Sequence, residues 1–179
     1  MGERAYACET RGFRVLFART RDIPFYVEGG FADVGITGKD VVAETGARVA
    51  SLLELPFSFC RLVLAAKENN GIASVSDLNG KRVATSFPAV TERFLRERGI
   101  ADTQIVRLEG AVEASIGAGI ANAIVDLTSS GATLRANGLR ELDCILKSSA
   151  VLIVNCSVAD SAEVEEFVER LAREVRKKC

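Results

Sequence analysis

One short stretch near the middle of the chain combines a carboxylate with a cluster of small hydroxyl residues. The apolar residues 123–125 predict a buried strand, which we expect to break at Asp126. A loop follows, and a helix over residues 132–137 is predicted to end at Gly138 as a left-handed cap. The candidate ligand-binding positions of this loop are Thr128, Ser129, Ser130, Gly131, Ala132 and Thr133.

A strand that leads through such a loop into a helix is suited to bind an anion. Free backbone N–H groups and hydroxyls donate hydrogen bonds, and the helix dipole favours negative charge. At the carboxyl end of a strand, where α/β proteins bind ligands, Asp126 is suited to hold sugar hydroxyls. The stretch therefore fits a phosphate beside a ribose, although an ordinary turn with Ser and Thr caps has the same composition.

Composition excludes several classes of chemistry. The 179 residues include no histidine, so Ser-His triads, histidine general bases and His-ligated metals are ruled out. A net charge of −1 argues against a nucleic-acid partner, and no apolar run approaches the roughly 20 residues that cross a bilayer, so no membrane partner is expected. The five cysteines have no CxxC spacing, which predicts reduced thiols in a cytoplasmic protein rather than a zinc site.

The elements that must position this chemistry alternate between strands and helices, which predicts an α/β protein with mostly parallel sheets. A polar segment with Asn-Gly turns at residues 67–80 marks the expected crossing between two lobes. The first lobe would comprise residues 1–66 and 150–179, and the second lobe residues 67–149. Strands are predicted at residues 13–18, 32–36, 51–56, 59–66, 82–85, 104–108, 123–125, 142–146 and 151–154, and helices begin near residues 22, 40, 88, 132 and 161.

Five segments, in order, resemble the catalytic subunit of ATP phosphoribosyltransferase, the first enzyme of histidine biosynthesis. The family signature is followed from Glu113 through Gly119 to residues 124–127 and 130–139. The resemblance extends over most of the chain, from about residue 14 to residue 155. The other matching segments are residues 19–24, 33–38, 55–62 and 148–153.

This resemblance implies two periplasmic-binding-protein-like lobes with the active site in a cleft between them. The reaction would transfer the phosphoribosyl group of phosphoribosyl pyrophosphate to N1 of ATP and release pyrophosphate, with Mg²⁺ bound through the substrate phosphates. Such chemistry needs no histidine, because it depends on aligning two polyanions and stabilising the departing pyrophosphate.

By match to the family pattern, three residues are expected to be catalytic. Asp126 would hold the ribose hydroxyls, Arg19 would face the pyrophosphate or triphosphate groups, and Glu113 would brace the cleft near the sugar. From the residues alone, Arg19 is also compatible with a solvated charge at a strand end, and Glu113 with a plain helix cap.

The resemblance also implies a substrate-binding set. The loop at residues 128–133 would cradle the 5-phosphate, and Thr37 and Gly38 would line the nucleotide side. Thr85, which ends a predicted strand, belongs to the same set.

Three features depart from the family pattern. We find no counterpart of the family's first strand and its Lys-Gly-Arg-Leu turn, which leaves truncation, a misassigned start or loss of the strand as explanations. Asn122 stands where the signature has an acidic residue, and Ser86 where a basic residue is usual. A non-catalytic anion-binding module and an inactive paralogue therefore remain alternatives.

The length is similar to that of the family's short form. That form pairs with a regulatory subunit resembling histidyl-tRNA synthetase, so the expected assembly is a catalytic homodimer within a hetero-oligomer.

Overall fold

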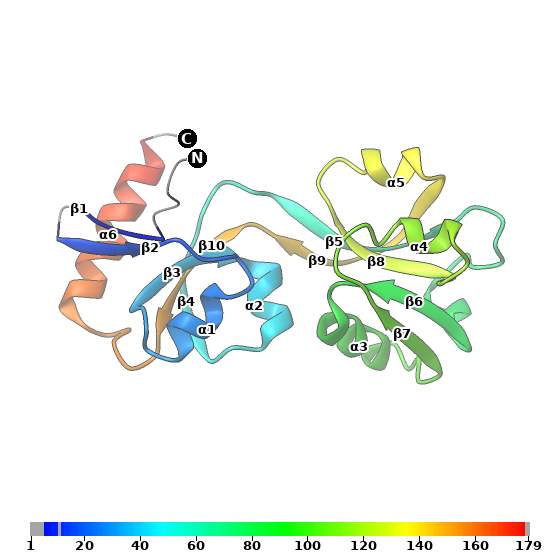
Figure 1. Cartoon of the computed structure of the whole chain (residues 1–179), viewed down its shortest axis with the longest axis horizontal. Coiled ribbons are helices and arrows are strands. Elements are labelled where there is room, and N and C mark those ends of the chain that lie inside the picture. The colour runs from blue at the N-terminus through cyan, green and yellow to red at the C-terminus, as the bar shows by residue number, and fades with distance from the viewer. Residues whose placement is uncertain (1–5, 11, 178–179) are drawn as a thin grey trace. The chain divides into compact units, whose positions relative to one another are not determined.

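The chain divides into two compact units. The computed structural model describes residues 6–10 and 12–177, with Met1–Leu55 and Val151–Cys179 in unit 1 and Pro56–Ala150 in unit 2 (Figure 1). The expected boundary after residue 66 is wrong, because strand β5, Cys60–Lys67, belongs to unit 2. There β5 pairs with both β8 and β9, which buries the apolar run that the sequence assigned to the first lobe.

Unit 1 contains a three-stranded sheet in the order β3-β10-β4, where β10 and β4 are antiparallel. Its small core consists of Val27, Val151 and Ile153, packed beneath helix α1. Pro24 in the first turn favours this helix start, although Asp22 makes no side-chain cap bond. The bounds are α1 Ile23–Glu28, β3 Val34–Gly38, α2 Lys39–Thr45, β4 Val49–Glu54, β10 Ala150–Asn155 and α6 Ala162–Arg176.

A two-stranded antiparallel hairpin precedes this sheet in the chain. Strand β2, Phe13–Leu16, lies within the predicted segment, but β1, Ala7–Thr10, was not predicted. Residues 7–10 lack the apolar alternation that would predict a strand. They form one because they pair with β2. Phe13 of β2 packs against Phe167 of α6, with ring centroids 5.4 Å apart.

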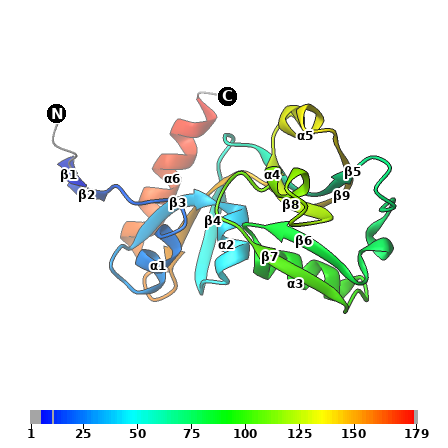
Figure 2. The same cartoon turned by 45° about the vertical axis from the view of Figure 1, so that its right-hand side comes forward.

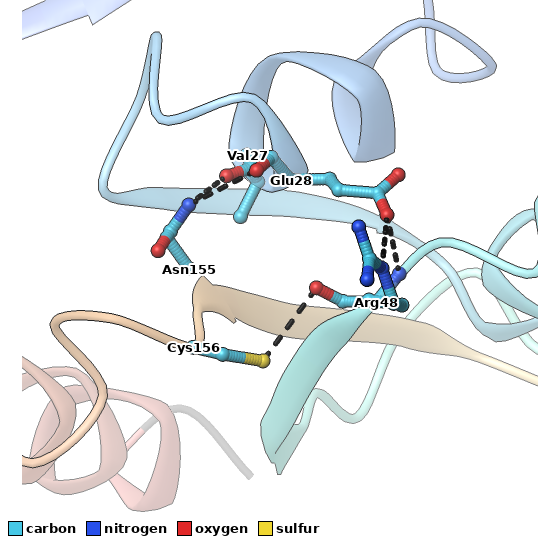
Figure 3. A network of polar contacts seen from close by, with 5 residues as sticks. All are labelled: Val27, Glu28, Arg48, Asn155 and Cys156. Atoms are coloured by element: carbon cyan, nitrogen blue, oxygen red, sulfur yellow. Dashed lines mark hydrogen bonds and ion pairs between the residues drawn. The ribbon is translucent and has the colours of Figure 1, made fainter.

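A polar network holds the end of α1 against the strands of unit 1 (Figure 3). The Asn155 amide donates to the carbonyl oxygens of Val27 at 2.6 Å and Glu28 at 3.2 Å. These carbonyls belong to the last turn of α1; that of Val27 also accepts from the Gly30 N–H at 3.1 Å, whereas Asn155 is the donor to that of Glu28 among the described residues. Arg48, just before β4, donates through its N–H and Nε to the Glu28 carboxylate. One asparagine and one ion pair therefore fix α1 to β10 and β4.

Unit 2 is built on a five-stranded mixed sheet in the order β7-β6-β8-β5-β9. The α/β class is confirmed, but the sheets are not mostly parallel: β6 is parallel to β7 and β8, whereas β5 is antiparallel to β8 and β9. The bounds are β5 Cys60–Lys67, η1 Val75–Leu78, β6 Lys81–Thr85, α3 Pro88–Glu97, β7 Thr103–Arg107, α4 Ala114–Gly117, β8 Ala123–Thr128, α5 Ala132–Ala136 and β9 Leu139–Ser148.

Helices cover both faces of this sheet (Figures 1 and 2). On one face, Ala84 and Ile124 pack with Val112 and Leu134 from the side of α4 and α5. Because neighbouring residues of a strand point to opposite faces, Thr85 points to the other face, toward α3. Asp126 lies two residues after Ile124 and therefore shares the face of α4 and α5.

Strand β8 is longer than predicted. It does not break at Asp126 but continues to Thr128, because β5 pairs with it to the end: Val63 lies opposite Asp126, and Arg61 opposite Thr128. Asp126 is therefore held inside a ladder, and only the hydroxyl residues beyond Thr128 form the loop.

We expect Asn155→Ala to lower the free energy of unfolding by about 1–3 kcal/mol, because it removes the donor to the Glu28 carbonyl and one of the donors to the Val27 carbonyl. Urea unfolding measures the loss. Asn79→Ala is the control, because the exposed Asn79 side chain bonds to no residue that the structure describes. Equal midpoints for the two variants would contradict the assigned role of Asn155.

Candidate functional site

Asp126 and Glu113, two of the predicted catalytic residues, both belong to unit 2. Burial raises the pKa of Asp126 above its ordinary value of 3.8; a hydrogen bond from the Leu127 N–H, at 2.8 Å, opposes the shift, and the negative charge of Glu113 adds a smaller upward contribution. The Glu113 carboxylate is therefore within electrostatic reach of the Asp126 carboxylate.

Glu113 is not a helix cap. It occupies the position before α4, but its side chain makes no capping hydrogen bond. The preceding backbone is bent, with positive φ values at Gly110 (81°) and Ala111 (45°). A positive φ is uncommon at a residue with a Cβ atom, and such strain persists only where the surroundings impose it. The Ser115 hydroxyl, which donates to the Val112 carbonyl at 2.6 Å, is one such restraint.

The hydroxyl-rich loop after β8 is held in shape by its own side chains. The buried Thr128 hydroxyl accepts from the Gly131 N–H at 2.9 Å, and Ser130 Oγ accepts from the Ala132 N–H at 3.3 Å. The N–H groups of Ser129 and Ser130 donate to no residue in the described part of the chain. The loop therefore keeps two free amide donors on exposed residues, the arrangement that an anion requires.

Thr85 does not join this group. Its side chain is fully buried, and its hydroxyl accepts from the Phe87 N–H at 2.8 Å. The Thr91 hydroxyl, which donates to the Phe87 carbonyl at 2.7 Å, lies 3.5 Å from that of Thr85. These bonds fix the turn between β6 and α3, so the structure gives Thr85 a positioning role on the face opposite Asp126.

The departure from the family pattern at Asn122 has a structural account. Its Oδ1 accepts from the Arg82 N–H at 3.0 Å, and its own N–H donates to the Arg82 carbonyl at 2.8 Å. A neutral amide oxygen suffices for this contact, which holds the start of β8 beside β6. At the other departure, Ser86 is buried.

The remaining predicted residues belong to unit 1. The Thr37 hydroxyl donates to the Thr20 carbonyl at 2.9 Å, which brings the end of β3 beside the segment that starts with Arg19. Arg19 is exposed and forms no ion pair with any residue that the structure describes. At Gly38 any Cβ would collide with the Asp40 carboxylate, so this buried carboxylate already occupies the start of α2.

One residue near the loop was missed by sequence reasoning. Arg135 of α5 donates through Nη1 to the Ser130 carbonyl at 3.1 Å. Its position four residues after Gly131, one helical turn, is the signal that could have identified it.

Across residues 6–10 and 12–177, no group of three or more His, Cys, Asp or Glu side chains is arranged to hold a metal ion. None of the helices in that range is long and apolar enough to span a membrane.

The chain is similar to one family over most of its length. The profile of the HisG family, described as ATP phosphoribosyltransferase, matches residues 19–173. The ATP phosphoribosyltransferase of Gemmatimonas aurantiaca is 44% identical over 98% of this chain and 63% of its own length. That of Methanococcoides burtonii is 46% identical over 87% of this chain and 54% of its own. The chain thus spans between half and two thirds of these relatives.

Solved structures agree in fold. A chain of the ATP phosphoribosyl transferase (HisG:HisZ) complex from Thermotoga maritima superposes with a TM-score of 0.88, at 31% identity, over 99% of this chain and 87% of that one. The substrate-binding protein of an amino acid ABC transporter superposes with a TM-score of 0.63 at 19% identity, over 88% of this chain and 71% of that one, which shows the shared periplasmic-binding-protein-like fold alone.

Asp126→Asn should stabilise the fold at neutral pH. The folded-state pKa of Asp126 is raised, so the unmutated chain loses stability as pH rises from the ordinary value of 3.8 through the folded value. The amide carries no charge and still accepts from Leu127. Thermal unfolding should show a higher midpoint for the variant at pH 7.5 and a difference that shrinks toward pH 4. Asp160→Asn, at an exposed site, controls for the charge change.

Thr85→Val should lower the free energy of unfolding by about 1–3 kcal/mol, because the isosteric change removes the buried hydroxyl that accepts from the Phe87 N–H. Denaturant titration measures this. The same substitution at exposed Thr45 is the control, and a Thr85→Val midpoint no lower than that of Thr45→Val would refute the positioning role.

Proposed function

The chain belongs to the HisG family of ATP phosphoribosyltransferases, and from this membership we propose that it transfers the phosphoribosyl group of phosphoribosyl pyrophosphate to N1 of ATP, releasing pyrophosphate. This is the first step of histidine biosynthesis. The observation that carries the proposal is the half-buried Asp126 carboxylate at the end of the strand that leads into a loop with two unpaired N–H groups.

The proposed roles follow from that geometry. The Asp126 carboxylate accepts hydrogen bonds from the ribose hydroxyls, and it does so best when ionised. The residues 128–133 hold the 5-phosphate through the free N–H groups and the exposed hydroxyls of Ser129, Ser130 and Thr133. Because burial raises the pKa of Asp126, turnover should fall as pH is lowered through that pKa.

In unit 1 the proposal assigns Arg19 to the pyrophosphate or triphosphate groups. An exposed guanidinium without an ion pair to any described side chain supports this assignment, since its charge is available to a ligand. Thr37 and Gly38 would line the nucleotide side, with the bond from Thr37 to the Thr20 carbonyl holding the two segments together.

Mg²⁺ is part of the proposal as an ion held by substrate phosphates. Mg²⁺ dehydrates reluctantly, so such an ion would keep most of its bonds to phosphate oxygens and water. The ion would neutralise charge on the departing pyrophosphate.

The Thermotoga maritima chain was solved in a HisG:HisZ complex. We extend that to this chain as a proposal: a catalytic homodimer that assembles with a HisZ-type regulatory subunit. Cys8, Cys60, Cys144 and Cys156 are free thiols, which supports a reducing, cytoplasmic setting.

Asp126→Ala should reduce turnover by about 100-fold or more, because it removes an interaction with the reacting sugar. The assay follows pyrophosphate release from ATP, phosphoribosyl pyrophosphate and Mg²⁺, with and without a HisZ-type chain. Asp160→Ala, far along the sequence in unit 1 and exposed, is the matched control. An unchanged rate for Asp126→Ala would remove this residue from the site.

A binding module without chemistry is the second candidate. It is favoured by the likeness in fold to the amino acid ABC transporter protein at a TM-score of 0.63. Saturable binding of phosphoribosyl pyrophosphate, with no pyrophosphate release under either assay condition, would support this module over the transferase.

A further inference from the structure

We propose that Arg135 is a further substrate-positioning residue, whose guanidinium binds the phosphate of the sugar phosphate at the loop of residues 128–133. The inference rests on the proposed function and extends it, because it adds a side-chain cation to a site otherwise built from amides and hydroxyls.

The side chain of Arg135 points back toward the loop of residues 128–133. Arg135 lies in the last turn of α5, where an arginine ordinarily serves the carbonyl end of the helix. Here the side chain runs back along the helix, and Nη1 donates to the Ser130 carbonyl at 3.1 Å. The guanidinium is therefore held at the loop and not at the end of α5.

The guanidinium of Arg135 lies close to Gly131. A Cβ atom at Gly131 would lie 3.0 Å from Nη1 and 3.9 Å from Cζ of Arg135, so the guanidinium packs across the bare backbone of this glycine. Gly131 also has a φ of +72°, which a residue with a side chain rarely adopts. Gly131 therefore has two roles: it adopts the positive φ of the turn, and its lack of a side chain lets the Arg135 guanidinium reach the loop.

The positive charge of Arg135 also favours a phosphate ligand. Arg61, Arg98 and Arg107 of unit 2 each pair with a carboxylate. Arg135 pairs with none among residues 6–10 and 12–177, and its side chain is exposed. Its positive charge lies beside a loop whose Ser129 and Ser130 N–H groups are also unpaired. A cation and free amides gathered at one loop fit a phosphate dianion, which a guanidinium binds with several donors at once.

Binding of ribose 5-phosphate tests the proposal on the full chain. Arg135→Gln should weaken binding by about 10- to 100-fold, the range expected for a hydrogen bond to a charged group, and should make binding less sensitive to salt. Arg135→Lys should recover part of the affinity because it keeps the charge. In turnover, the KM for phosphoribosyl pyrophosphate should rise by a similar factor, with kcat changed much less.

Arg140→Gln is the matched control, because Arg140 also donates to a backbone carbonyl, that of Ile72, at the same distance of 3.1 Å. It should bind ribose 5-phosphate as the unmutated chain does. Thermal unfolding of each variant distinguishes a role of Arg135 in binding phosphate from a role in stabilising the loop. Arg135→Gln should keep the unfolding midpoint of the unmutated chain.

Two results would overturn the inference while leaving the proposed function intact. One is ribose 5-phosphate affinity within about twofold of the unmutated chain in Arg135→Gln. The other is a loss of affinity accompanied by a lower unfolding midpoint and not relieved by Arg135→Lys, which would make Arg135 a brace for the loop. If the unmutated chain bound neither ribose 5-phosphate nor phosphoribosyl pyrophosphate, the proposed function itself would fail, and this inference with it.

Discussion

The pairing of β8 with a strand on each side is the constraint on which unit 2 depends. Parallel β6 and antiparallel β5 hold β8 through its buried residues, and the β5 ladder continues past Asp126 to Thr128. A carboxylate in that position is fixed and partly removed from water, which makes it a strong acceptor for hydroxyls and a cost to the fold. The strand that gives the site its rigidity therefore also carries a carboxylate whose partial burial disfavours its charged form, and such costs are common at functional sites.

Local pattern predicted most elements of this chain, since apolar runs, Pro24, Pro88 and the glycines after helices act over a few residues. It failed where pairing partners decided the outcome. The order of β1 comes from β2, the length of β8 comes from β5, and the assignment of β5 to unit 2 comes from β8 and β9. Except for β2, which follows β1 directly, these pairing partners lie far along the chain from the strand that they affect.

The site was predictable to the extent that it lies in one segment. Asp126 and the loop could be proposed from residue type and order, and Glu113 from the family resemblance; their roles stay predictions. The burial of Thr85 on the face opposite Asp126 was not predictable from the motif, because the alternation of side chains across a strand decides its face; its role in substrate binding stays a prediction. Arg135 was overlooked for a related reason: its role depends on the direction of a long side chain along α5.

The entry and exit of unit 2 lie next to each other. Cys60 at the start of β5 is the Cα partner of Ser148 at the end of β9, and the Ala150 N–H donates to the Phe57 carbonyl. Unit 2 is one continuous stretch, whereas the sheet of unit 1 needs β10 from beyond it. During synthesis, therefore, all the strands of unit 2 are translated before β10, the central strand of the unit 1 sheet, is complete.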